Sequence, residues 1–108
     1  MDPVEQELVC SYSRTLLMDR IDIFLKAKAE TENLQVRYPA DPSIESVLKQ
    51  LSFLIELQRG ERSDAIRLND IIIGVLALKE IEPLDPDVAE ILYSVAEEIG
   101  VMKRVMLK

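Results

Sequence analysis

A length of 108 residues predicts a single domain, residues 1–108, with one hydrophobic core. Its 20 acidic and 13 basic residues give a formal net charge of −7, which argues against a nucleic-acid-binding protein, because binding to phosphates requires a basic surface. The one cysteine, Cys10, excludes an internal disulfide bond and favours a reducing compartment, so we expect a cytoplasmic protein. We expect no secretory signal, since the N-terminus is acidic, and no membrane span, since no apolar run is long enough.

The first predicted helix begins near Pro3, a residue that suits the first turn of a helix. Apolar residues then recur at three- and four-residue steps from Leu8 to Leu25, which is typical of an amphipathic helix. The pattern weakens in the polar sequence KAKAETENLQ that follows. We therefore expect this long helix to fray or end between Ala29 and Asn33.

A second helix is predicted between two breaks in the chain. The sequence RYPADP interrupts the first helix, and Asp41 can cap the next one with Pro42 at its first position. Gly60 suits the C-terminal end of that helix. Phe53 and Leu57 lie off its main apolar face; we expect them to be buried, and an exposed pair that binds a partner is the alternative.

The most apolar continuous stretch, LNDIIIGVLALKEIE, spans Leu68 to Glu82. We predict that it is the buried central helix of a small bundle, because it is apolar on nearly all sides. Ser63 or Asp64 would begin this helix, and Pro83 would end it. Helical spacing places these apolar residues on one face: Leu68, Ile71, Ile72, Val75 and Leu78.

A second face of this stretch carries small residues. Asp70, Gly74, Ala77 and Ile81 share it, and glycine inside a helix costs about 1 kcal/mol relative to alanine. Close approach of a neighbouring helix would offset that cost. We expect tight packing within the chain here, and docking of a partner is the alternative.

The last helix repeats the combination of an aspartate cap and a proline, with Asp85 before Pro86. Its predicted inward residues are Val88, Ile91, Leu92, Val95, Ile99 and Met102. The helix either ends at Gly100 or continues to Met106. Short connections make successive helices antiparallel neighbours, so the predicted fold is an all-α, four-helix up-down bundle with a long first helix.

The residue types that catalysis most often requires are scarce. The chain contains no histidine, which removes the commonest general base and the commonest metal ligand. Cys10 lies near an apolar helix face without an adjacent base, and a single cysteine does not make a zinc site. No phosphate-binding glycine loop is present. We therefore expect a helical binding module without catalytic residues, cofactor or metal, and not an enzyme.

Part of the sequence resembles a known family. The pieces RYP at Arg37, KQL at Lys49 and IGVLALKEIEPLDPD from Ile73 to Asp87 resemble, in order and spacing, the small helical immunity proteins of type VI secretion systems. Within that family the similarity is to the immunity protein of an NAD(P)⁺ glycohydrolase effector. The joined pattern A-L-K-E-I-x-x-x-D-P-D is more specific than the short pieces alone, and the similarity covers about half the chain, to around Leu92.

The resemblance implies a function that requires no chemistry. An immunity protein binds its cognate toxin domain in the cytoplasm and blocks access to the active site. The acidic charge fits this role, because a cleft that binds nucleotides tends to be electropositive and complementary charge speeds encounter. Acidic side chains could then occupy the positions of substrate phosphates.

Polar residues of the shared motifs are the candidate partner-binding residues. The predicted toxin-binding residues are Lys79, Glu80, Asp85 and Asp87 at one corner, Arg37 and Tyr38 as a second group, and Asp64, with Glu61 and Arg62, as a third region. For Asp85 a role as helix cap is favoured over direct contact. For Lys79 and Glu80, a solvated helix face is as good an explanation.

Two other functions stay open on the sequence. One is a helical adaptor or regulatory subunit unrelated to toxins. The other is a homo-oligomer, a homodimer in the simplest case, that buries Phe53, Leu57 and the face containing Gly74 against a second copy. The chemistry of the toxin also stays open, since related immunity proteins can face toxins that attack other nucleotides.

Overall fold

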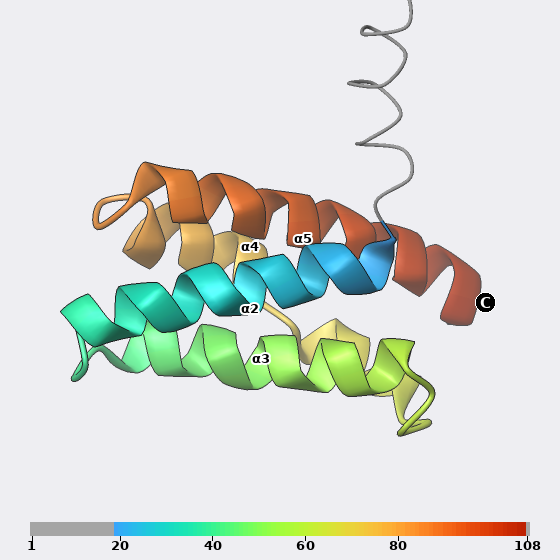
Figure 1. Ribbon diagram of the computed structural model, residues 1–108. Helices are drawn as coiled ribbons and strands as arrows, with labels where there is room; N and C mark the ends of the chain where they lie inside the picture. The colour runs from blue at the N-terminus through green and yellow to red at the C-terminus, as the bar shows by residue number, and fades with distance from the viewer. Residues whose placement is uncertain (1–18, 108) are drawn as a thin grey trace, which may run out of the picture.

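The computed structural model describes residues 19–107, and all of its regular elements are helical. The elements in chain order are α2 (Arg20–Arg37), α3 (Pro42–Gln58), the 3₁₀-helix η1 (Ala65–Asp70), α4 (Ile73–Leu76), the π-helix η2 (Ala77–Ile81) and α5 (Pro86–Met106). Helix α2, helix α3, the segment from η1 to η2, and helix α5 run in alternating directions, and the four α-helices pack into one globule (Figure 1). The predicted all-α, four-helix architecture is confirmed.

Helix α2 differs from the prediction at both of its ends. It begins at Arg20, after Asp19 in an extended conformation, so a helix from near Pro3 is not continuous past this point. Residues 1–18, with Cys10 and the apolar repeat from Leu8 to Leu17, lie outside the described residues. The predicted end between Ala29 and Asn33 is wrong, because the helix continues to Arg37.

Packing explains why the polar half of α2 stays helical. Phe24, Ala27, Thr31 and Leu34 form a buried stripe along this helix. Thr31, a polar member of the stripe, donates its hydroxyl hydrogen to the carbonyl oxygen of Ala27 at 2.7 Å, which satisfies the buried polar group. The stripe faces α3 and α5, and this tertiary packing outweighs the weak local pattern.

Helix α3 follows the sequence prediction closely. Asp41 caps it: one carboxylate oxygen accepts hydrogen bonds from the amides of Ser43 at 2.8 Å and Ile44 at 3.4 Å. Beyond the other end, Gly60 has a φ of 76°, a left-handed conformation that favours glycine. Phe53 and Leu57 are 8% and 5% exposed, so the preferred expectation of burial is confirmed.

The predicted continuous central helix is wrong. The chain forms η1, then an extended residue at Ile71, and then the short α4, which continues into η2. Asp64 makes no capping hydrogen bond. The side chains that are fully buried in α4 and η2 are Ile73, Ala77 and Ile81. The predicted face of the helix is therefore only partly the buried one, since Ile72, Val75 and Leu78 are exposed.

The interruption between η1 and α4 allows the side chains on both sides of it to be buried. Leu68 of η1 and Ile73 of α4 are both fully buried, although five residues of a continuous α-helix would turn them about 140° apart. The extended residue Ile71 between them changes the direction of the backbone, so that both side chains point into the core. Gly74 lies against α5, where an added Cβ would stand 3.3 Å from the Cβ of Ala96. Tight packing of this small-residue face within the chain, the preferred expectation, is confirmed.

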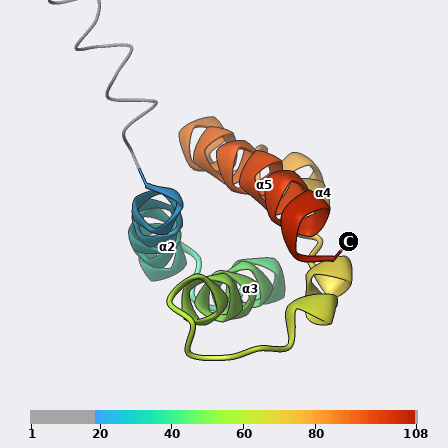
Figure 2. The ribbon, with the colours of Figure 1, turned by 90° about the vertical axis from the view of Figure 1, so that its right-hand side faces the viewer.

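Helix α5 matches the prediction and takes the longer of its two ends. One carboxylate oxygen of Asp85 accepts hydrogen bonds from the amides of Asp87 at 3.0 Å and Val88 at 3.3 Å. The helix passes through Gly100 and ends at Met106. Viewed along the bundle, α5 lies between α2 and α4, which are on opposite sides (Figure 2).

Candidate functional site

An ion pair joins two of the predicted contact regions. Nη2 of Arg37, at the end of α2, donates a hydrogen bond to Oδ2 of Asp85, while Oδ1 of the same carboxylate caps α5. The hydrogen bond from Arg37, followed by that from the Val88 amide, holds the pKa of Asp85 below its ordinary value. The Arg37 guanidinium also lies 5.9 Å from the ring centre of Tyr38. The first and second predicted groups therefore meet at one end of the bundle.

This end of the molecule is strongly acidic. Residues 80–90 contain no lysine or arginine, and we call their carboxylates the acidic end: Glu80, Glu82, Asp85, Asp87 and Glu90. Glu80 and Asp87 are exposed, as is the neighbouring Lys79. Asp85 is partly neutralised by Arg37, so it positions the turn before α5 rather than offering a free charge. The remaining carboxylates form a surface suited to a basic partner.

Tyr93 ties the acidic end to α5. Its hydroxyl donates a hydrogen bond of 3.0 Å to a carboxylate oxygen of Glu82. Partial burial, and then the negative Glu82, raise the pKa of Tyr93. This contact fixes the turn that follows η2 and orients Glu82 without removing its negative charge.

Asp64, with Glu61 and Arg62, lies away from the acidic end. It follows the C-terminal end of α3, whereas Arg37 lies near the N-terminal end of that helix (Figure 1). Both of its carboxylate oxygens accept hydrogen bonds from Arg62, at 2.7 and 2.8 Å. The hydrogen bonds from Arg62 lower the pKa of Asp64 to about 2, and those contacts raise the pKa of Arg62.

Arg62 connects this corner to α3. Its guanidinium donates a 2.9 Å hydrogen bond to Glu56 and lies 4.6 Å from the ring centre of Phe53. Asp64 and Arg62 thereby link the loop after α3 to the helix itself. The geometry gives both residues a structural task, and a role of Asp64 in partner binding stays a prediction.

Sequence reasoning missed an exposed apolar surface. The side chains of Ile72, Val75 and Leu78 are 48%, 51% and 57% exposed, and their spacing places them along one side of α4 and η2. We call these three residues the apolar ridge. Their apolar character predicted burial. No local signal in the sequence indicated the interruption of the helix before α4 that leaves these side chains exposed to solvent.

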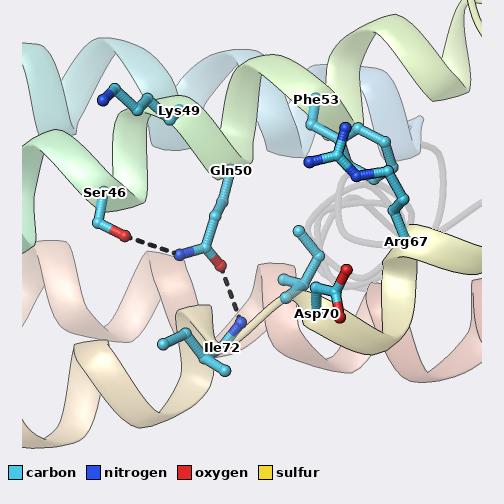
Figure 3. Close-up of a pocket in the computed structure, with 8 residues that line it drawn as sticks. Ser46, Lys49, Gln50, Phe53, Arg67, Asp70 and Ile72 are labelled. Atoms are coloured by element: carbon cyan, nitrogen blue, oxygen red, sulfur yellow. Dashed lines mark hydrogen bonds between the residues drawn. The ribbon is translucent and has the colours of Figure 1, made fainter.

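Two hollows adjoin the apolar ridge at its Ile72 end. One lies between α3 and η1, where Arg67 covers the Phe53 ring and Gln50 reaches across to the backbone of Ile72 (Figure 3). The other lies between α4 and α5, and its lining includes Val75, Gly74 and Lys103. Ile72 lines both hollows and Val75 lines the second, so the two depressions lie beside the first part of the ridge.

The described residues contain no group suited to holding a metal ion. Among residues 19–107, no three histidine, cysteine, aspartate or glutamate side chains are close enough together. Within the same range no helix is long and apolar enough to cross a membrane. The homo-oligomer alternative needed Phe53, Leu57 and Gly74 at an interface. Phe53 and Leu57 are buried in the chain instead, and Gly74 is half-buried against Ala96 of α5.

Comparison with known proteins identifies the family. The family model described as Tsi6 matches residues 19–103, which is most of the chain and nearly all of its described part. The chain matches no curated protein and no solved structure. The helical fold of the described residues agrees with this match. The chain belongs to the Tsi6 family, non-enzymatic type VI secretion immunity proteins that bind and neutralise a cognate toxin.

Proposed function

We propose that this protein binds the toxin domain of an NAD(P)⁺ glycohydrolase effector in the cytoplasm and covers its active site. Family membership supplies the immunity role. The finer assignment is supported by the resemblance of the segment from Arg37 to around Leu92 to the immunity protein of such an effector. The inhibitor needs no catalytic group, because occupying the cleft is enough to exclude NAD(P)⁺.

The acidic end is the observation that carries this proposal. NAD(P)⁺ is bound through its negatively charged phosphates, so a cleft that accepts it presents basic groups or helix N-termini. Glu80 and Asp87 are exposed carboxylates at the same end of the bundle, and Tyr93 holds Glu82 in the turn between them. Their charges can pair with the groups that otherwise hold phosphate, which would both block the cleft and speed association.

Within this end, the residues have different tasks. Glu80 and Asp87 would contact the toxin, together with Lys79 at the margin. Arg37 and Asp85 would hold the C-terminal end of α2 against the start of α5, because each satisfies the other's charge. Tyr38, over which Arg37 lies, adds an aromatic surface at the same end, and aromatic residues are frequent in binding hot spots.

The test measures intracellular NAD⁺ in cells that express the toxin domain from the neighbouring gene, with and without this protein. We expect the toxin to deplete NAD⁺ and this protein to restore it. If the protein restores growth although NAD⁺ never fell, the glycohydrolase assignment is wrong and the toxin has another activity. If cells die regardless of this protein, the proposed pairing itself is wrong.

A charge reversal tests the role of the acidic end. Glu80→Lys should lower the association rate constant with the purified toxin domain by roughly tenfold at low salt, and the loss should shrink as salt screens the charges. Asp22→Lys is the matched control, because Asp22 is exposed and lies in the first turn of α2, at the other end of that helix from Arg37. An equal loss in both variants would mean that net charge, not the acidic end, governs association.

A further inference from the structure

We propose that the apolar ridge of Ile72, Val75 and Leu78 is the hydrophobic anchor of the toxin interface. This inference rests on the proposed function, since it names the surface that holds the toxin after the acidic end has guided its approach. The sequence pattern predicted that these three residues belong to the core.

The exposure of the ridge is unusual for its position. It alternates with Ile73, Ala77 and Ile81, which are fully buried in the same short segment. The chain thus places its most apolar stretch half in the core and half at the surface. Adjacent exposed aliphatic side chains in a soluble protein mark interaction surfaces more often than isolated ones do.

The surrounding structure prevents the ridge from turning inward. Oε1 of Gln50 accepts a 2.8 Å hydrogen bond from the amide of Ile72, and Nε2 of Gln50 donates one of 3.0 Å to the hydroxyl of Ser46 (Figure 3). These bonds fix the chain at the break before α4. On the other side, Gly74 fits closely against Ala96. The inner positions are filled, so the ridge is presented to solvent in a fixed conformation.

A fixed ridge is well suited to tight binding. Little conformational entropy is lost when a partner binds a surface that is already held in place. The hollow beside Ile72 and Gln50 offers a depression next to a projection, a shape that a partner's side chains can fill. Interface hot spots concentrate in such well-packed apolar centres, with polar groups around them.

Charge indicates the toxin as the occupant. Leu78 and Glu82 are four residues apart, so they lie on the same side of this helical segment, and the apolar ridge ends beside the acidic end, where Lys79 and Glu80 are also exposed. A partner with an electropositive cleft complements the acidic end. A second copy of this chain does not, because two chains that each carry a formal net charge of −7 repel one another.

The experiment compares dissociation from the purified toxin domain. The variant carrying Val75→Ser and Leu78→Ser removes apolar surface without changing charge. It should raise the dissociation rate constant on the order of 100-fold and leave the association rate constant within about threefold. The matched control is Leu25→Ser, because Leu25 is 38% exposed on α2, across the bundle from α4. Its dissociation rate should stay within about threefold of the wild type.

Circular dichroism and thermal unfolding of each variant establish that the fold is kept, and the single Leu78→Ser variant gives a milder test. Unchanged dissociation of the folded double variant would overturn the anchor. If Glu80→Lys still slowed association in that case, the proposed function would stand while this inference failed. A free protein that is a dimer, and that the double variant converts to a monomer with unchanged toxin binding, would also overturn the inference in favour of a second copy.

Discussion

Helix α5 and the segment from η1 to η2 are both rich in aliphatic residues, yet only α5 is a continuous α-helix. Helix α5 has one buried stripe, an aspartate cap and packed neighbours on two sides. The other segment is more apolar, and it breaks at Ile71 into a 3₁₀-helix, a short α-helix and a π-helix. The contrast teaches that apolar content does not decide whether a helix is continuous; the positions of the neighbouring elements do.

The interrupted segment packs against a different set of helices before and after Ile71. Leu68 is fully buried in η1, which packs against α5, and Ile73 is fully buried in α4, which packs against both α5 and α3. Gln50 supplies the hydrogen-bond acceptor that the Ile72 amide lacks once the helix is broken. The π-helix, with the Glu82 amide bonded to the carbonyl of Ala77 at 2.8 Å, reaches the turn before α5 with one wide turn.

A pair of leucine truncations should give the largest difference between the two regions. Leu92→Ala removes a fully buried side chain from α5 and should cost about 2–5 kcal/mol of unfolding free energy, since it leaves a cavity. Leu78→Ala removes an exposed side chain of the apolar ridge and should change the unfolding free energy by about 0.5 kcal/mol or less. Urea denaturation of both variants measures this. Similar losses would mean that Leu78 is part of the core.

Two helical glycines should respond oppositely to alanine. At Gly100 of α5 an added Cβ meets nothing within 4 Å, so Gly100→Ala should stabilise the protein by about 0.5–1 kcal/mol through helix propensity. At Gly74 the same Cβ would stand 3.3 Å from that of Ala96, and we expect the cost of this close contact to exceed the gain in helix propensity, so that Gly74→Ala destabilises by up to about 1 kcal/mol. Thermal unfolding compares the two. Equal stabilisation by both would show that α4 and α5 separate easily.

Replacing Arg62 should change the pKa of Asp64, and this is the smallest of the predicted effects. The pKa of Asp64 is about 2 because Arg62 stabilises the carboxylate, so Arg62→Ala should move it up towards the ordinary 3.8. The native contact stabilises the fold above pH 3.8, and the stabilisation is lost as the pH falls towards 2. Carbon-13 NMR of the Asp64 carboxyl measures both values. An unchanged pKa in the variant would show that Arg62 does not hold Asp64 in solution.

The two long capped helices could be predicted from the sequence because their signals are local. Asp41 with Pro42, and Asp85 with Pro86, are adjacent residues whose capping geometry follows from their chemistry. The end of α2 could not be predicted in this way. Its polar C-terminal half is held helical by buried packing of Thr31 and Leu34 against other helices, which local propensity does not contain.

Some parts of the candidate site could likewise be predicted from the sequence, and others could not. Sequence motifs pointed to the residues of the acidic end, but not to the ion pair that joins Arg37 to Asp85, which lie 48 positions apart. The apolar ridge could not be predicted, because Ile72, Val75 and Leu78 have the composition of a core. Their exposure depends on the interruption of the helix at Ile71 and Ile72. The side chain of Gln50, which comes from a different helix, stabilises this interruption.

The most direct test of the toxin-binding surface is amide hydrogen exchange of this protein, alone and in complex with the toxin domain. We expect the complex to slow exchange in residues 72–82, which include the apolar ridge and the start of the acidic end. Exchange in the exposed part of α2 around Leu25 should be unchanged. Protection confined to α2, with residues 72–82 exchanging as in the free protein, would contradict the account.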